Sequence, residues 1–208
     1  MHATRNIMQG SDRGFTLVEV VVVIGIMVLL MAMTLVSFPQ LNERILIRKA
    51  GQQLVLDLRT AQSRAFAVRS IQCPAIVCPP TGGPRVPKGY GLRLHVGAPE
   101  YIMYADLDNS QTYNYAGGIA APNTDVLAQT ISFERGLKIT SIVDAGGTPF
   151  CVGGDIDIAF ATPAARMGIF CNGILAGETY IKTTITSPGV SVQTSVVSII
   201  TTGQILVQ

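Results

Sequence analysis

The sequence is poor in charge, and this limits the partners that it can bind by electrostatics alone. Only 13% of the residues are charged, and the formal net charge is +2. A nearly neutral chain gives no strong electrostatic argument for nucleic acid, whose binding generally needs a basic patch. Arg85, Lys88 and Arg93 lie near one another in the sequence. We interpret them as the edge of a solvated loop, with DNA binding as the alternative that is not favoured.

Histidine is scarce as well, and no set of residues typical of an enzyme can be assembled. The two histidines are His2 and His95, and nothing in the sequence places a nucleophile beside His95. The glycine pairs at 146–147 and 153–154 are interpreted as turns between strands, because neither opens a helix with the spacing of a phosphate-binding loop. We therefore expect a protein that is not an enzyme.

The four cysteines, Cys73, Cys78, Cys151 and Cys171, are not accompanied by clustered histidines. Their spacing also lacks the paired short intervals typical of zinc sites, so we expect no metal there. Four cysteines allow three disulfide connectivities. The small loop between the first two and a plausible hairpin between the last two favour Cys73–Cys78 with Cys151–Cys171.

One acidic loop is a candidate cation site. Asp106, Asp108, Asn109 and Ser110 place several oxygen atoms in one turn, and oxygen ligands are what Ca²⁺ prefers. The alternative is a solvated turn, because Asp and Asn side chains bond their own backbone. Gln111 stands where an EF-hand loop has glycine. We expect no cofactor, and calcium at Asp106 and Asp108 is the weaker reading.

The sequence is rich in apolar residues in one run near the N-terminus. Between Phe15 and Phe38 the only ionisable residue is Glu19. Roughly 24 residues with a rise of about 1.5 Å each are enough to cross a hydrocarbon core about 30 Å thick. A carboxylate at mid-membrane costs roughly 2.5–3.5 kcal/mol, so Glu19 should have a partner. A cut after Gly14 would create one, the α-amine of Phe15.

An ordinary secretory signal does not explain this run. Such a signal has a shorter apolar region followed by a small-residue cleavage site, and no such site follows promptly here. Arg5 and Arg13 precede the run against Asp12, a weak bias towards a cytoplasmic N-terminus. We therefore expect the helix to be kept, with everything after Phe38 outside the cytoplasmic membrane, where disulfides persist.

A helical period resumes beyond Pro39, which should kink or interrupt the helix because it lacks an N–H donor. Apolar and small residues are spaced alternately by four and three at Ile47, Gly51, Leu54, Leu58, Ala61, Ala65 and Val68. The small members of this stripe should let the helix lie close against a sheet. Segment 39–71 is therefore predicted to be the exported, amphipathic half of one long helix.

From residue 72 onward the pattern changes to alternation with Gly and Pro turns. Alternating or short apolar segments occur at 92–96, 101–106, 137–143, 156–160, 169–171, 181–185, 190–192 and 205–207. Short strands separated by such turns predict an antiparallel domain and not a βαβ sheet. The expected fold class is α+β, with a long N-terminal helix packed on an antiparallel β domain.

The stretch Arg13-Gly-Phe-Thr-Leu-Val-Glu19 resembles the class III signal of type IV prepilins and type II secretion pseudopilins. The resemblance implies cleavage after Gly14 by a prepilin peptidase and N-methylation of Phe15. It also implies that Glu19 pairs with the amine of a neighbouring subunit. The chain would then comprise a leader (1–14), a transmembrane helix (15–38), the exported half of the helix (39–71) and a β domain (72–208).

A second stretch, Leu54-Val-Leu-Asp-Leu-Arg-Thr-Ala-Gln-Ser-Arg-Ala65, resembles a helix of the H-type minor pseudopilins and their FimT-like pilin relatives, with Gln62 where those proteins usually have Arg. The resemblance implies a subunit of a type II secretion pseudopilus that serves protein export. The alternative is a type IV pilus minor pilin that displays a DNA- or surface-binding domain. Partners would be prepilin peptidase, other pilins or pseudopilins, and the secretion or pilus assembly platform. The protein would be single-pass in the bacterial inner membrane, and in a filament after assembly.

Overall fold

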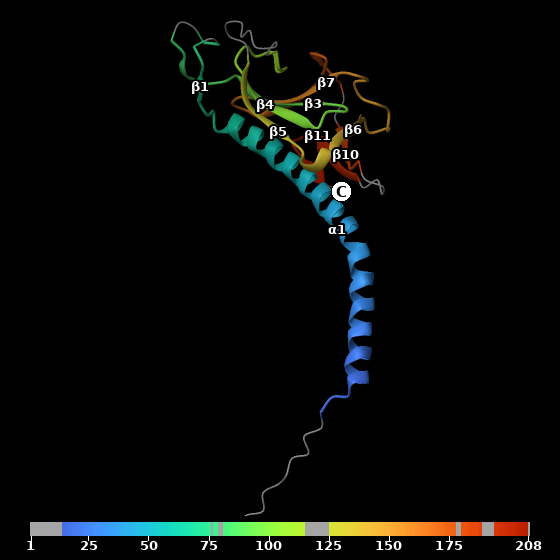
Figure 1. The fold of residues 1–208 in the computed structure, drawn as a ribbon. Coiled ribbons are helices and arrows are strands. Elements are labelled where there is room, and N and C mark those ends of the chain that lie inside the picture. Colours follow the sequence, from blue (N-terminus) through green and yellow to red (C-terminus); the bar gives the residue numbers. More distant parts are fainter. Residues whose placement is uncertain are drawn as a thin grey trace, which may run out of the picture. The chain divides into compact units, whose positions relative to one another are not determined.

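The computed structural model describes residues 14–75, 77–78, 81–114, 125–177, 180–188 and 194–207, and at 35–41 only the backbone. The chain divides into an N-terminal unit, Met1–Leu41, and a C-terminal unit, Asn42–Gln208. Helix α1 (Leu17–Phe66) runs through both (Figure 1).

In the N-terminal unit, α1 is apolar on every side. Its segment Leu17–Thr34 is long and apolar enough to cross a membrane, with a mean hydropathy of 2.7 and no residue buried in the single chain. The helix continues through Pro39, so the expected interruption is wrong. Proline removes one hydrogen bond, whereas the helical turns on both sides keep theirs.

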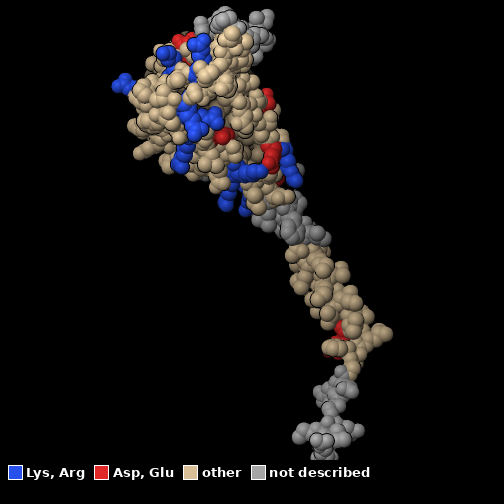
Figure 2. Space-filling model, turned by 90° about the vertical axis from the view of Figure 1, so that its left-hand side faces the viewer, with Lys and Arg blue, Asp and Glu red and all other residues tan. Residues whose placement is uncertain are grey.

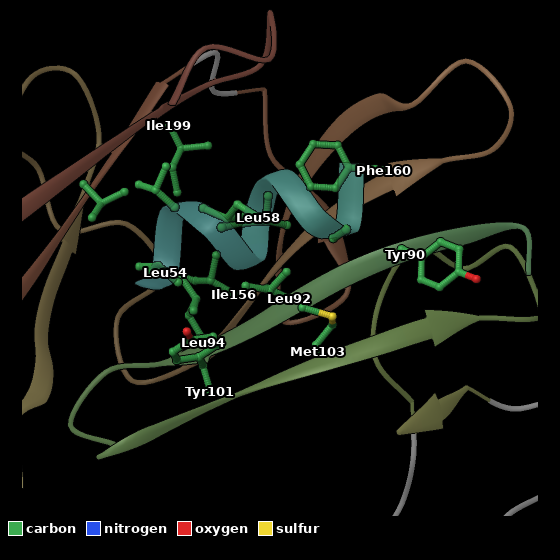
Figure 3. Packing of buried hydrophobic residues seen from close by; sticks show 14 of the residues in the cluster. Leu54, Leu58, Tyr90, Leu92, Leu94, Tyr101, Met103, Ile156, Phe160 and Ile199 are labelled. Atoms are coloured by element: carbon green, nitrogen blue, oxygen red, sulfur yellow. The ribbon is translucent and has the colours of Figure 1, made fainter. Parts of the chain in front are cut away.

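In the C-terminal unit, α1 buries one stripe of side chains. Leu54, Leu58, Ala61 and Ala65 are fully buried and Ile47 nearly so, which confirms the predicted period over these positions. Figure 3 shows Leu54 and Leu58 on the helix, facing labelled core residues of the sheets. The stripe is the face by which the helix contributes to the core.

The predicted extension of this stripe to Val68, and of the helix to residue 71, is wrong. Helix α1 ends at Phe66, and Val68 has φ 47° and is 42% exposed. Its N–H donates to the carbonyl of Ala65 at 3.3 Å, and the N–H of Arg69 donates to that of Arg64 at 3.3 Å. These two bonds form a Schellman C-cap, which ends a helix with a left-handed residue.

In the described part of the chain three antiparallel sheets follow α1, which confirms the α+β layout. The largest has the order β5-β4-β3-β7-β8-β9, with bounds Val126–Ser132, Glu100–Asp106, Gly89–His95, Asp155–Ala161, Arg166–Cys171 and Ile174–Leu175. The second has the order β12-β11-β10-β6, with bounds Ile205–Val207, Thr194–Ile200, Tyr180–Thr186 and Lys138–Val143. Strands β1 (Ile71–Cys73) and β2 (Gly83–Arg85) form the third, and a 3-10 turn spans Glu134–Gly136.

Both larger sheets contribute to one core with α1. The buried cluster includes Leu92 and Leu94 of β3, Ile156 of β7, and Ile185 and Ile199 of the four-stranded sheet. Figure 3 shows several of these side chains around the helix. The core therefore fixes the position of both sheets against the C-terminal half of α1.

The predicted strands differ from the structure in several places. Strands β1, β2, β5, β9 and β11 were not predicted, and the predicted segment 190–192 lies outside the described residues. In β6 the buried residues are Ile139 and Ile142, not an alternation from 137 to 143, because the pairing of β10 with β6 shifts register between Thr184 and Ile185. A bulge of this kind reverses the face of every later residue.

Two disulfides cross-link the C-terminal unit. Cys73 bonds Cys78, and Cys151 bonds Cys171. This is the connectivity that the sequence favoured, and it leaves no free cysteine in the chain. The first bond closes the loop after β1. The second joins β8 to the turn that precedes β7.

Candidate functional site

The N-terminus of α1 is capped by a side chain. Thr16 precedes the helix, and its Oγ1 accepts the N–H of Glu19 at 3.3 Å. Thr16 with Glu19 three residues later is the spacing of a capping box, in which the cap satisfies an N–H group that the helix leaves unpaired. Thr16 was not among the predicted site residues, although the Thr-x-x-Glu spacing is typical of a helix cap.

Glu19 therefore lies in the first turn of α1. A carboxylate is favoured there, because the peptide dipoles leave partial positive charge at a helix N-terminus. Gly14 and Phe15 lie before the helix, and the Phe15 side chain is 82% exposed. The Gly14–Phe15 bond thus lies just before the helix. The carboxylate of Glu19 is close to it in sequence and lies in the first turn of the helix.

The helix that follows presents an uncovered apolar surface. Large apolar side chains from Val20 to Met33 are 45–67% exposed in the single chain. An apolar surface of this kind is unfavourable in water. It suits surroundings of lipid or of the apolar faces of other helices. The arrangement fits a single-pass membrane anchor.

Such a layout defines a class: a pilin-like subunit with one N-terminal helix that fits a single-pass membrane anchor and a mostly antiparallel C-terminal unit. Residues 10–35 match the family model of the prokaryotic N-terminal methylation motif. The chain therefore carries the signature of the type IV pilin family. The motif implies processing by prepilin peptidase and assembly with other pilins, and it points to a structural subunit and not to an enzyme. Searches of curated proteins and of solved structures found no match.

The acidic loop after β4 brings three carboxylates together. Ligand oxygens of Asp106, Asp108 and Asp125 lie within 4.8 Å of one another. Asp125 was not among the predicted site residues, because it precedes β5 and reaches the loop only through the fold. All six carboxylate oxygens accept hydrogen bonds from N–H groups, which belong to Leu107, Asn109, Ser110, Gln111 and Asn114. These hydrogen bonds thus stabilise the conformation of the loop.

Burial controls the protonation of this cluster. It raises the pKa of Asp106 to about 6 and that of Asp125 to about 7, although backbone N–H groups act in the opposite direction. Burial also raises the pKa of Asp108, but hydrogen bonds from Ser110 and Asn114 outweigh it, so the pKa lies below its usual range. In mildly acidic solution the cluster therefore keeps its charge mainly on Asp108.

The three basic residues considered for DNA do not form an open patch. Arg93 makes two hydrogen bonds to Asp157, Nε to Oδ1 at 2.9 Å and Nη2 to Oδ2 at 2.7 Å. It also pairs with Asp155 at 3.3 Å, and its guanidinium lies 5.0 Å from the centre of the Tyr113 ring. Only Arg85 and Lys88 remain exposed. The ion pairs form because Arg93 is the cross-strand neighbour of Asp157 in β3 and β7.

Within the described chain, the hydrogen bonds and ion pairs of His95 involve no nucleophile. Its Nδ1 lies 2.9 Å from Oδ1 of Asp155, at the surface end of the same network. An imidazole and a carboxylate alone provide no attacking group. The pair is therefore assigned a structural role beside Arg93.

Proposed function

We propose that this protein is a minor pseudopilin of the H type, assembled into a type II secretion pseudopilus that serves protein export. In this proposal prepilin peptidase hydrolyses the Gly14–Phe15 bond and methylates the new amine of Phe15. The observation that carries the proposal is the capped first turn of α1, where Glu19 follows that bond closely and an exposed apolar helix follows Glu19.

The charge pair would select the register of neighbouring subunits. The ammonium of Phe15 in one subunit meets the carboxylate of Glu19 in the next, within a bundle of apolar helices. At an effective dielectric constant of about 20, two charges about 4 Å apart attract by about 4 kcal/mol. A wrong register leaves both charges buried without a partner, which costs several kcal/mol for each ion. In this proposal Glu19 sets the register because every other register leaves its carboxylate buried without a partner.

The H-type assignment draws support from the second motif. Its apolar and small residues, Leu54, Leu58, Ala61 and Ala65, are the fully buried positions of α1. Gln62, where the motif departs from the family pattern, is only partly buried, so the departure leaves the helix–sheet contact intact. The alternative, a DNA-binding minor pilin, loses its candidate patch because Arg93 is held by Asp157.

We further propose that the N-terminus is cytoplasmic, the apolar part of α1 spans the bacterial inner membrane, and the C-terminal unit lies outside. Its partners there would be other pseudopilins and the secretion assembly platform. The two disulfides suit this placement, because disulfides persist in oxidising compartments outside the cytoplasm.

Intact-mass measurement after co-expression with an active prepilin peptidase tests the first step. The expected product lacks residues 1–14 and carries one added methyl group. Retention of the leader would overturn the proposal.

The second step is tested with Glu19→Ala and, as a matched control, Glu100→Gln, since Glu100 is exposed on β4. Glu19→Ala should be cleaved normally but be depleted from the filament fraction of cells that carry the remaining subunits, whereas the control should assemble. Normal assembly of Glu19→Ala would contradict the pairing role.

A further inference from the structure

Strand β5 is an open edge of the six-stranded sheet. Among the described residues it pairs with β4 alone, and five of its seven residues are exposed. Its sequence, Val-Leu-Ala-Gln-Thr-Ile-Ser, contains no charged residue and no proline. Natural edge strands use both kinds of residue to block pairing with other chains. A register shift in the pairing with β4 is the one such device visible there. The outward N–H and C=O groups of β5 can therefore accept another strand.

Arginines line one end of this edge. Arg64 and Arg69, from the end of α1 and the turn after it, line a groove of about 360 Å³ together with Val126, Leu127 and Ala128 of β5. Figure 1 shows β5 alongside the C-terminal part of α1, and Figure 2 shows Lys and Arg side chains gathered on this side of the C-terminal unit. The groove is therefore basic where the strand begins.

The backbone of Arg69 and the side chain of Arg64 each have a partner, and neither partner is acidic. The Tyr90 hydroxyl donates to the carbonyl of Arg69 at 2.6 Å, and Nη1 of Arg64 lies 3.4 Å from Sδ of Met103. Within the described chain, the salt bridges involve neither Arg64 nor Arg69. Arg59 lies in the adjoining groove with the same two residues and adds a third positive charge. The guanidinium groups are thus available to an external carboxylate.

We propose that the β5 edge and these arginines form a docking site for an extended acidic segment of a partner protein. The segment adds to β5 as a further strand through main-chain hydrogen bonds, and its carboxylates contact Arg64 and Arg69. This site goes beyond the proposed role in filament assembly, because it is independent of Gly14, Phe15 and Glu19. A failure of leader processing would leave it untouched.

Charge and shape favour this occupant over two others. A second copy that paired in parallel through the same edge would bring like-charged arginines together, which is unfavourable. Single-stranded nucleic acid is bound by stacking on exposed aromatic rings as well as by charge. The aromatic residue at this groove, Tyr90, is fully buried and provides no such platform.

Fluorescence anisotropy with the full-length protein in detergent micelles tests the site. The probe is a labelled synthetic peptide with two aspartates followed by alternating threonine and valine. We expect saturable binding that weakens with salt and falls about tenfold or more in Arg64→Gln/Arg69→Gln. The matched control Arg166→Gln changes an exposed arginine of β8 in the same sheet and should bind as the parent does.

Two altered probes separate the two parts of the site. Methylation of alternate amide nitrogens in the peptide should abolish binding, because it removes main-chain donors but no charge. Replacement of its aspartates by lysines should abolish it as well. The single variant Arg69→Gln, at an exposed position, keeps the test valid if the double variant fails to fold.

Several results would overturn the proposal. These are no saturable binding of the acidic peptide, equal binding by the arginine variant, and equal binding of the methylated peptide. Tighter binding of a single-stranded oligonucleotide through the same arginines would make the groove a nucleic-acid site instead. Self-association that Ala128→Lys abolishes would make the edge an interface between copies of this chain.

Discussion

At Gly51, helix α1 packs closely against the four-stranded sheet. A Cβ at this position would meet Oγ of Ser195 inside van der Waals contact, and would lie 3.4 Å from both Cβ of Ser195 and Cγ1 of Val207. Ser195, on β11, is 2% exposed, and within the described chain its hydroxyl oxygen has no hydrogen-bond partner. One oxygen atom therefore determines whether alanine fits.

We expect Gly51→Ala to lower the free energy of unfolding by about 1 kcal/mol. Overpacking costs about 1–3 kcal/mol, and the better helix propensity of alanine returns about 0.5–1 kcal/mol. Ser195→Ala should raise it by about 1 kcal/mol, because an unpaired buried hydroxyl costs about 1–3 kcal/mol. In the double variant the clash is absent and both gains remain, so stability should exceed that of the parent by about 2 kcal/mol.

The measurement is urea unfolding of the full-length protein in detergent, followed by near-ultraviolet circular dichroism. The chain has no tryptophan and six tyrosines, all beyond residue 89, so the tyrosine part of the signal reports the C-terminal unit alone. The predicted coupling in the double-mutant cycle is about 2 kcal/mol, well above the ~0.5 kcal/mol of independent sites. If Gly51→Ala stabilises the parent and the cycle shows no coupling, the close approach of α1 to β11 is wrong.

Three further predictions concern the C-terminal unit. Val68→Gly should raise the free energy of unfolding by roughly 0.5–1 kcal/mol, because a β-branched residue is strained at φ 47° and its side chain is already 42% exposed. Val68→Ala keeps a Cβ and should therefore gain less stability. An equal gain in the two variants would refute the explanation. The pKa values of Asp106 and Asp125, raised to about 6 and about 7 in the folded chain, mean that the folded state holds protons that the unfolded state releases, so their contribution to stability falls as pH rises from about 4 to about 7. Urea unfolding at about pH 5 and about pH 8 should show this loss, and Asp125→Asn should reduce it by about half or more; an unchanged slope would show that Asp125 is not its source. Because all six carboxylate oxygens of the cluster already accept N–H groups, calcium should shift the thermal midpoint by less than about 1 °C; a larger rise that Asp108→Asn abolishes would establish a calcium site.

The helical part of the fold could be predicted because its physical signals are local. The spacing of Leu54, Leu58, Ala61 and Ala65 reports a buried helix face directly, and these residues are fully buried. The helix end at Phe66 could not be predicted in the same way. It depends on Val68 adopting a conformation that its own side chain disfavours, and only hydrogen bonds between neighbouring turns compensate for that.

The missed strands and site residues depend on contacts between distant segments. Strand β5 shows no alternation because most of its residues are exposed on both faces, and β11 shows none because successive residues are buried. Arg93 looks like a free surface charge until the register of β3 and β7 brings Asp157 beside it. Asp125 likewise joins Asp106 only after the sheet has formed.

The two halves of helix α1 have different surroundings. A substitution in one half can therefore affect function without affecting folding of the C-terminal unit. Glu19 belongs to the N-terminal unit and is not a member of the buried cluster, whereas Leu58 is one of its members. A genetic screen that scores only protein abundance or disulfide formation would therefore detect no defect for most substitutions in the first half of the helix. Functional defects there would be visible only when several subunits are measured together.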